Sequence, residues 1–215
     1  MKVSIFQFSL FGINTYVVYD PATLDCAIID PGMMNKEEEN AIVDFISRNK
    51  LKVTDVINTH LHLDHAVGDN FLKGKYGVPV KASKLDLPLG ERMQQQAYMF
   101  GINKDFKGAE ITDFLNDGDV IKIGEGELKV IAVPGHSLGS VALYDKADGF
   151  VIVGDALFQG SIGRTDLPGG DYATLIKSIK SRLLALPDDT VVYPGHGEPT
   201  TIGDERRLNP YLQGK

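Results

Sequence analysis

Short apolar runs separated by turn residues dominate the first third of the chain and predict β-strands. Residues 3–8, 14–19 and 26–30 are rich in β-branched and aromatic side chains, and Asp20-Pro21-Ala22-Thr23 separates the second run from the third. Such side chains favour a pleated, half-buried surface, whereas Asp and Pro favour turns. We therefore expect three strands before the first helix.

Farther along the chain, strand-like runs alternate with helical patterns. Asn35 is the expected N-cap of the first helix, because Glu37, Glu38 and Glu39 follow it in the first turn, where the helix dipole favours acidic residues. Two groups of strands, each followed by helices, suggest two sheets, although the pattern alone indicates only the α/β or α+β class. We expect strands at 53–58, 79–82, 120–123, 128–133, 140–144, 150–154 and 190–193, and helices at 36–49, 67–76, 84–101, 172–186 and 203–208.

Length and charge narrow the possible functions. The 215 residues contain no linker, low-complexity stretch or evident repeat, and the candidate site residues described below are scattered through the chain, so we expect one domain spanning 1–215. The net charge of −7 argues against general binding of nucleic acid or of anionic membranes. No apolar run approaches the length that spans a bilayer.

The location is expected to be the cytoplasm. Residues 1–8 alternate apolar and polar like a strand and lack the apolar core of a signal peptide. The single cysteine, Cys26, cannot form an internal disulfide and fits a reducing compartment. Because Cys26 lies in an apolar run, a buried, inert thiol is favoured over a nucleophile.

All five histidines lie just after predicted strands. Three of them occur in the run Thr59-His60-Leu61-His62-Leu63-Asp64-His65, and His136 and His196 each follow a Pro-Gly pair. Asp155 also follows a strand. Open α/β sheets commonly build their sites in the loops after strand ends. Because imidazole is the commonest nitrogen ligand of transition metals, we expect a metal site.

The spacing of the first cluster allows it to serve two ions. In an extended backbone His60 and His62 point to the same side and can hold one ion together. As the chain turns into a helix, Asp64 and His65 face a neighbouring point. Asp64 is therefore a candidate ligand, and it is also a candidate acceptor for the proton of an attacking water.

The later candidates complete both sites. His136 can supply a third nitrogen to the first ion, and His196 can join the second. Asp155 can bridge the two ions, although Asp is also common as a turn or cap residue. Nitrogen and carboxylate ligands together suit Zn²⁺, with Fe²⁺ or Mn²⁺ also compatible. A closed structural zinc site is the alternative, but it usually uses four Cys or His ligands, and here seven candidates occur with no thiolate nearby.

Such a pair of ions favours hydrolysis. Two metals about 3.5–4 Å apart can hold a hydroxide and polarise a carbonyl. Ser137 and Ser161 have no free histidine to act as a base, which disfavours a serine hydrolase. Asp30, in Asp30-Pro31-Gly32 at a strand end, is a candidate to hydrogen-bond a liganding histidine and fix its tautomer, or else a simple turn residue.

The histidine run, with His136, Asp155 and His196 in order, resembles the metallo-β-lactamase superfamily. Gly163-Arg164-Thr165-Asp166 and the segment 195–205 are similar to its short glyoxalase II-like (hydroxyacylglutathione hydrolase-like) members. The resemblance covers nearly the whole chain. It implies an αββα sandwich, which is a four-layer α/β fold with two mixed β-sheets and helices outside.

The resemblance also implies ligands and an activity. The activity is hydrolysis of a small-molecule thioester, such as S-D-lactoylglutathione, by a metal-bound hydroxide. Arg164 is a candidate to meet a substrate carboxylate, or else a surface or structural arginine. Full-length glyoxalase II enzymes carry a C-terminal helical extension that binds glutathione, whereas this sequence ends 19 residues after His196, which leaves the thiol part open. The implied ligands are His60, His62, His136 and Asp155 for the first ion, and Asp64, His65, His196 and Asp155 for the second.

Other functions fit the same residues less fully. A persulfide dioxygenase of this superfamily would use a single Fe²⁺, so metal analysis separates it from the hydrolase. A non-catalytic metal-binding scaffold would turn over no thioester, lactone or β-lactam. An antibiotic-degrading β-lactamase is disfavoured by the absence of an export signal, and an RNA-processing nuclease by the acidic charge. The oligomeric state is left open.

Overall fold

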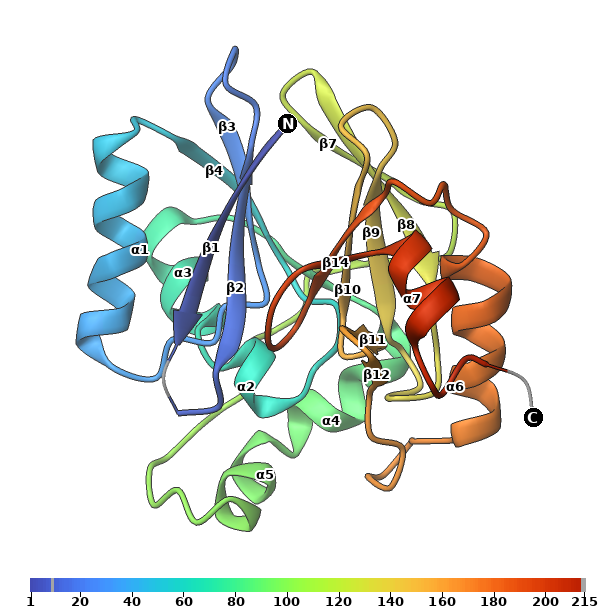
Figure 1. The fold of residues 1–215 in the computed structure, drawn as a ribbon. Coiled ribbons are helices and arrows are strands. Elements are labelled where there is room, and N and C mark those ends of the chain that lie inside the picture. Colours follow the sequence, from blue (N-terminus) through green and yellow to red (C-terminus); the bar gives the residue numbers. More distant parts are fainter. Residues whose placement is uncertain (9, 214–215) are drawn as a thin grey trace.

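The computed structural model describes residues 1–8 and 10–213, and it places two six-stranded sheets face to face with helices on their outer sides (Figure 1). Each sheet contains both parallel and antiparallel pairs. The expected αββα sandwich of two mixed sheets is therefore confirmed. Both sheets contribute strand ends to the same edge of the molecule, which is the edge that carries the candidate ligands.

The first sheet is antiparallel at its start and parallel at its end. The pairs β1–β2 and β2–β3 are antiparallel, and the pairs from β3 to β6 are parallel. The helices α1 (Lys36–Arg48) and α3 (Asp69–Tyr76) provide two of the crossovers that parallel strands require. The strands, in spatial order, are β1 (Lys2–Phe8), β2 (Ile13–Tyr19), β3 (Asp25–Ile29), β4 (Lys52–Ile57), β5 (Val80–Ala82) and β6 (Asp113–Phe114).

The second sheet has one parallel pair, β10–β13, within an otherwise antiparallel order. The connection between these two strands contains α6 (Tyr172–Ser178) and a π-helical segment, Ile179–Leu183. A last helix, α7 (Ile202–Leu208), follows the sheet. The strands, in spatial order, are β14 (Thr200–Thr201), β13 (Val191–Pro194), β10 (Phe150–Gly154), β9 (Val141–Asp145), β8 (Gly126–Ala132) and β7 (Val120–Ile123).

Alternation along the strands decides which side chains fill each layer. On β2, Tyr16 and Val18 pack in the core between the sheets, whereas Val17 packs in the cluster beneath α1 and α3, as expected when successive side chains point to opposite faces. Cys26 is fully buried in that outer cluster. Burial, together with the charge of Asp25, raises the pKa of the Cys26 thiol to about 12, which agrees with the expected inert thiol.

The prediction of one continuous helix over residues 84–101 is wrong. A 3₁₀ turn (Lys84–Asp86), α4 (Leu87–Glu91) and α5 (Met93–Met99) replace it, and the chain leaves helical geometry at Arg92. Pro88 lies in the first turn of α4, where its missing N–H costs little, and Gly90 weakens the helix. The helix expected at 172–186 likewise ends its α-helical part at Ser178.

Several elements were too short to leave a sequence pattern. Four strands have only two residues each: β6, β14, and the two strands of a hairpin, β11 (Leu157–Phe158) and β12 (Ser161–Ile162). A period-two alternation cannot be recognised in so short a run. The one-turn helix α2 (Leu63–Ala66), by contrast, lies within the histidine run, where a turn into a helix was expected. None of the described helices is long and apolar enough to cross a membrane.

Contacts between the two sheets fix the edge that carries the candidate ligands. Asn14 of β2 donates its backbone N–H to the carbonyl of Gly195 at 2.8 Å and its side-chain N–H to that of Pro194 at 3.1 Å. Ile13 forms an isolated antiparallel bridge with His196. The start of β2 in one sheet is therefore fastened to the end of β13 in the other.

Candidate metal centre

The structure brings all seven predicted ligands together at this edge. His60 and His62 follow β4, and the chain then enters α2, whose N-cap is His62 in extended geometry. The expected change from extended chain to helix is therefore present. The remaining ligand candidates follow β8, β10 and β13. Three overlapping groups of side chains with ligand atoms within 4.8 Å of one another result, namely His60, His62 and His136; His60, His65 and Asp155; and Asp64, His65 and His196.

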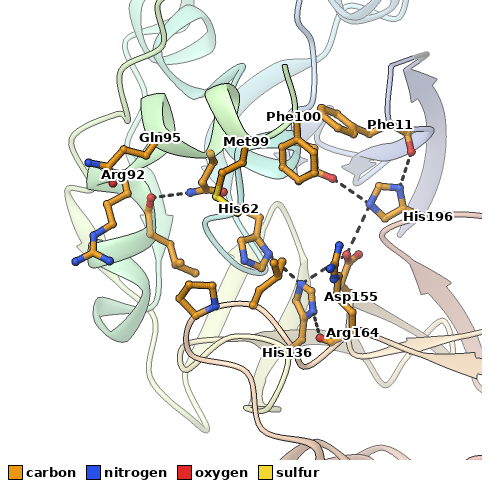
Figure 2. Close-up of a pocket in the computed structure, with 15 residues that line it drawn as sticks. Phe11, His62, Arg92, Gln95, Met99, Phe100, His136, Asp155, Arg164 and His196 are labelled. Carbon is orange, nitrogen blue, oxygen red and sulfur yellow. Dashed lines mark hydrogen bonds and ion pairs between the residues drawn. The ribbon is translucent and has the colours of Figure 1, made fainter. Parts of the chain in front are cut away.

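Three imidazoles form the first group. Nδ1 of His62 lies 2.9 Å from Nε2 of His136, which in turn lies 3.2 Å from Nε2 of His60 (Figure 2 shows His62 and His136). All three side chains are buried. Three imidazole nitrogens that converge on one point can offer lone pairs to a shared cation.

The second group combines a carboxylate with two imidazoles. Oδ2 of Asp64 lies 3.1 Å from Nε2 of His196 and 3.9 Å from Nε2 of His65. His65 is fully buried, whereas Asp64 and His196 are partly open to the solvent. This group therefore has a closed side at His65 and an accessible side at His196.

Asp155 lies between the two groups. Its Oδ1 is 3.3 Å from Nε2 of His65, and its Oδ2 is 3.7 Å from Nε2 of both His136 and His196. One carboxylate therefore contacts members of both groups. This is the position that a bridging ligand occupies.

Buried polar atoms without hydrogen bonds give a second indication, independent of the number of histidines, that the residues fit metal ions. Nε2 of His65 and Oδ1 of Asp155 are buried and lie 3.3 Å apart, and neither makes a hydrogen bond of good geometry among the described residues. Buried polar atoms are almost always satisfied, and a cation would satisfy both. Gly195 also keeps the space beside these atoms free of a side chain. A Cβ at this position would lie 2.1 Å from Oδ1 of Asp155 and 2.6 Å from Cε1 of His65.

The first group is electrostatically suited to ligation. Burial, followed by the neighbouring His136 and His65, lowers the pKa of His62 to about 4. Burial also lowers the pKa of His60 well below its usual value. Both rings are therefore neutral near pH 7, and the neutral imidazole is the form that binds a metal.

In the second group the side chains are charged: the carboxylates are ionised and His65 is protonated. Burial opposes ionisation of Asp155, but the charge of His65 holds its pKa well below the usual range. Burial likewise opposes the charge on His65, yet Asp155, Asp30 and Asp64 raise its pKa well above the usual value. Without a metal ion, a proton on His65 balances the negative charge of the surrounding carboxylates. A bound metal ion would displace this proton.

Most of the histidines are oriented through the nitrogen that faces away from the centre. His136 Nδ1 donates to the carbonyl of Arg164 at 2.8 Å, and His196 Nδ1 donates to that of Phe11 at 3.0 Å (Figure 2). Nδ1 of His65 lies 3.0 Å from Oδ2 of Asp30. Each contact leaves Nε2 directed at the centre, and such contacts fix the tautomer of a liganding histidine.

Asp86 is a supporting residue that the sequence did not reveal. Its side chain accepts the Ser137 hydroxyl at 2.7 Å and the backbone N–H of Gly139 at 2.6 Å and of Leu61 at 3.3 Å. It is 1% exposed. Asp86 therefore ties the loop of His60 and His62 to the loop of His136. No motif marks it, because its role depends on two loops that are distant in the sequence.

The centre opens into a cavity of about 310 Å³ (Figure 2). Its walls include Phe11, Leu89, Met99 and Phe100, none of which carried a sequence signal for a site. Arg164, the predicted contact for a substrate carboxylate, also lines the cavity. Its guanidinium, however, forms two hydrogen bonds of 2.7 Å with the carboxylate of Asp166.

Comparison with known proteins supports a shared family. Residues 9–196 match the family described as the metallo-β-lactamase superfamily. The chain is 37% identical over 219 residues to the hydroxyacylglutathione hydrolase GloC of Haemophilus influenzae, and the match covers 100% of both chains. The family expected from the histidine run is confirmed.

Three solved structures share the fold over nearly the whole chain. The B3 metallo-β-lactamase BLEG-1 gives a TM-score of 0.90 at 31% identity, covering 99% of this chain and 100% of that one. TTHA1623 in a di-iron-bound form gives 0.86 at 36% identity, covering 98% and 100%. ETHE1 from Myxococcus xanthus gives 0.80 at 28% identity, covering 98% and 84%.

Proposed function

Because the chain belongs to the metallo-β-lactamase superfamily of metallo-hydrolases, we propose that it hydrolyses acyl thioesters at two divalent metal ions. The observation that carries the proposal is the position of Asp155, which contacts members of both ligand groups at the base of an open cavity. The hydroxyacylglutathione hydrolase named above, at 37% identity over its full length, supports the thioester class. S-D-lactoylglutathione or a related acyl thioester is the proposed substrate.

The proposed ligand assignment is the one that the family resemblance implies, and the distances are compatible with it. His60, His62, His136 and Asp155 would hold one ion, and Asp64, His65, His196 and Asp155 the other. When bound, the ions supply Lewis acidity and lower the pKa of water. Zn²⁺ suits the mixture of nitrogen and carboxylate ligands, and Fe²⁺ or Mn²⁺ are compatible with it. The di-iron form of TTHA1623 supports a centre of two ions in this fold.

The protein's own side chains position the reactants. Asp64 lines the cavity, and its Oδ2 lies 3.1 Å from Nε2 of His196. The charges of His65 and His196 outweigh the effect of burial and lower the pKa of Asp64, so its carboxylate is ionised and can accept a proton from an attacking water. Apolar side chains of the cavity wall would flank the reacting carbonyl.

The direct test is thioester hydrolysis by the metal-loaded protein. Protein loaded with Zn²⁺, and separately with Fe²⁺, is assayed for thiol release from S-D-lactoylglutathione and from simple S-acetyl thioesters. A β-lactam belongs in the same panel because BLEG-1 shares the fold. Thiol release that is lost in His60→Ala supports the proposal. No hydrolysis of any thioester by fully loaded protein would refute it and favour the metal-binding scaffold.

A persulfide dioxygenase is the second candidate. His60, His65 and Asp155 form a set of two histidines and one carboxylate within 4.8 Å, which is the ligand type of mononuclear iron oxygenases. Oxygen consumption with a persulfide, together with one iron per chain, would favour this candidate. Two ions per chain and thiol release without oxygen uptake would favour the hydrolase.

We further propose a small-molecule substrate and a cytoplasmic location. The net charge of −7 disfavours nucleic acid and anionic membrane surfaces as partners. The single, fully buried Cys26 suits a reducing compartment.

A further inference from the structure

Two arginines line the cavity, and their guanidinium groups have different surroundings. Arg164 is held in a two-bonded pair with Asp166, and both of these side chains are more than half exposed. The positive charge of Arg164 is thus largely balanced, and its backbone carbonyl is used to orient His136. A substrate anion would have to compete with Asp166 for this guanidinium.

Arg92 is the unbalanced cation of the cavity. Within residues 1–8 and 10–213 its side chain has neither a hydrogen-bond partner nor an ion-pair partner. It lies at the break between α4 and α5. In Figure 2, Arg92 and Gln95 lie at the side of the cavity away from Asp155 and His196. The free positive charge is therefore remote from the proposed reacting centre.

The wall between these two ends carries apolar side chains. Leu89 of α4 and Met99 of α5 line the cavity on the two sides of the break at Arg92. The ring of Phe11 packs edge-on against Phe100, with 5.0 Å between the ring centroids. Met99 and Phe100 remain 70% and 48% exposed. Large apolar side chains exposed around a cavity commonly mark a binding surface.

The geometry points to a defined substrate class: an anionic thioester in which one arm is an apolar chain that ends in a negatively charged group held by Arg92. This inference rests on the proposed function, because it takes the reacting carbonyl to lie at the metal centre. Apolar atoms of the chain would pack against Leu89, Met99 and Phe100. The charge would be recognised at Arg92 and not at Arg164, the residue that the sequence suggested.

A binding experiment tests this inference without requiring turnover. The probe is 6-(2-oxopropylthio)hexanoate, in which a ketone replaces the cleavable thioester, and its methyl ester is the neutral match. Calorimetry compares both ligands on the metal-loaded protein. We expect the acid to bind up to about fivefold more tightly than the ester, the scale of one accessible ion pair. The short acid (2-oxopropylthio)acetate, compared with its own methyl ester, should show a smaller preference because its chain is four methylene groups shorter and holds the charge nearer the proposed reacting centre.

Variants identify the cation responsible. Arg92→Ala should remove the preference for the acid, Arg92→Lys should keep part of it, and Arg164→Ala should leave it intact. A preference that survives in Arg92→Ala, or that disappears in Arg164→Ala, would overturn the inference, as would equal binding of acid and ester by the unmodified protein. Because binding is measured and not hydrolysis, a failure of the proposed thioesterase activity would be seen separately in the thiol-release assay.

Discussion

Oδ2 of Asp30 lies 3.0 Å from Nδ1 of His65, and both side chains are fully buried. Asp30 also accepts the backbone N–H and the hydroxyl of Thr59, each at 2.7 Å. Its φ of 50° lies in the left-handed region, which Asp and Asn tolerate better than other non-glycine residues. Asp30 therefore fixes the start of the histidine run and the orientation of His65 together, which fits the contact role expected from the sequence better than a turn role alone.

Replacing Asp30 tests this contact. Asp30→Asn keeps the tolerated backbone geometry but removes the negative charge next to His65. We expect the affinity for the second ion to fall about 10- to 100-fold, the usual effect of losing such a supporting carboxylate. Competition with a chromophoric chelator measures it. Asp44→Asn, on the exposed face of α1, is the matched control, and equal metal affinity in the two variants would contradict the role of Asp30.

Asp155 and His196 should differ in how many ions they affect. Asp155 contacts both ligand groups, whereas His196 belongs to one. We expect Asp155→Ala to weaken both ions and His196→Ala to weaken mainly one, with thiol release more than about 100-fold lower in the former. Elemental analysis of the purified variants gives the metal content. Unchanged metal in Asp155→Ala would refute the bridging assignment.

Asp86 is expected to support both stability and the first ligand group. Asp86→Ala leaves the N–H of Gly139 without its buried acceptor and removes one of the two partners of the Ser137 hydroxyl, the other being the Ser140 hydroxyl at 2.7 Å. The free energy of unfolding should fall by about 1–3 kcal/mol, and metal affinity should fall with it. Urea unfolding measures the first effect. Ser137→Ala removes only one of these contacts, so a loss as large as that of Asp86→Ala would show that Asp86 does not join the loops in the proposed way.

Asp69 should make stability depend on pH. Burial raises the pKa of Asp69 well above its usual range, and its Oδ2 has no hydrogen-bond partner in the described part of the chain. The folded state therefore binds this proton more tightly than the unfolded state does. Stability from this group is greatest below the unfolded pKa of about 4 and declines as the pH rises toward the folded pKa.

The isosteric variant Asp69→Asn removes that titration. The unfolding free energy of Asp69→Asn minus that of the unmodified protein should therefore increase as the pH rises across the acidic range. Urea unfolding of both proteins in a chelating buffer, between about pH 4 and 8, measures it. Parallel pH profiles would show that Asp69 does not carry the buried proton.

The clustering of the candidate ligands could be predicted from the sequence, whereas the cavity beside them could not. His60 and His62 follow a buried strand, and two residues apart in an extended chain they face the same side. Residue type and local geometry are therefore enough to predict that they lie together. The wall formed by Phe11 and Phe100 comes from segments about 90 residues apart. Nothing local distinguishes such side chains from ordinary core residues.

The break at Arg92 shows the same limit. The pattern of residues 84–101 predicts one helix, and the position of Arg92 in the cavity arises because the chain leaves helical geometry there. Arg164, which the motif offered as a candidate substrate contact, pairs with Asp166, two residues later. Which of two arginines is available depends on tertiary contacts that the motif does not encode.

The number of metal ions bound per chain tests the central claim most directly. Metal-free protein is titrated with Zn²⁺ while binding is followed by calorimetry, and the bound metal is then determined by elemental analysis after desalting. Two ions per chain are predicted, with thiol release reaching its maximum only when both are bound. A single tightly bound ion, with full activity at one equivalent, would contradict a shared centre of seven ligands.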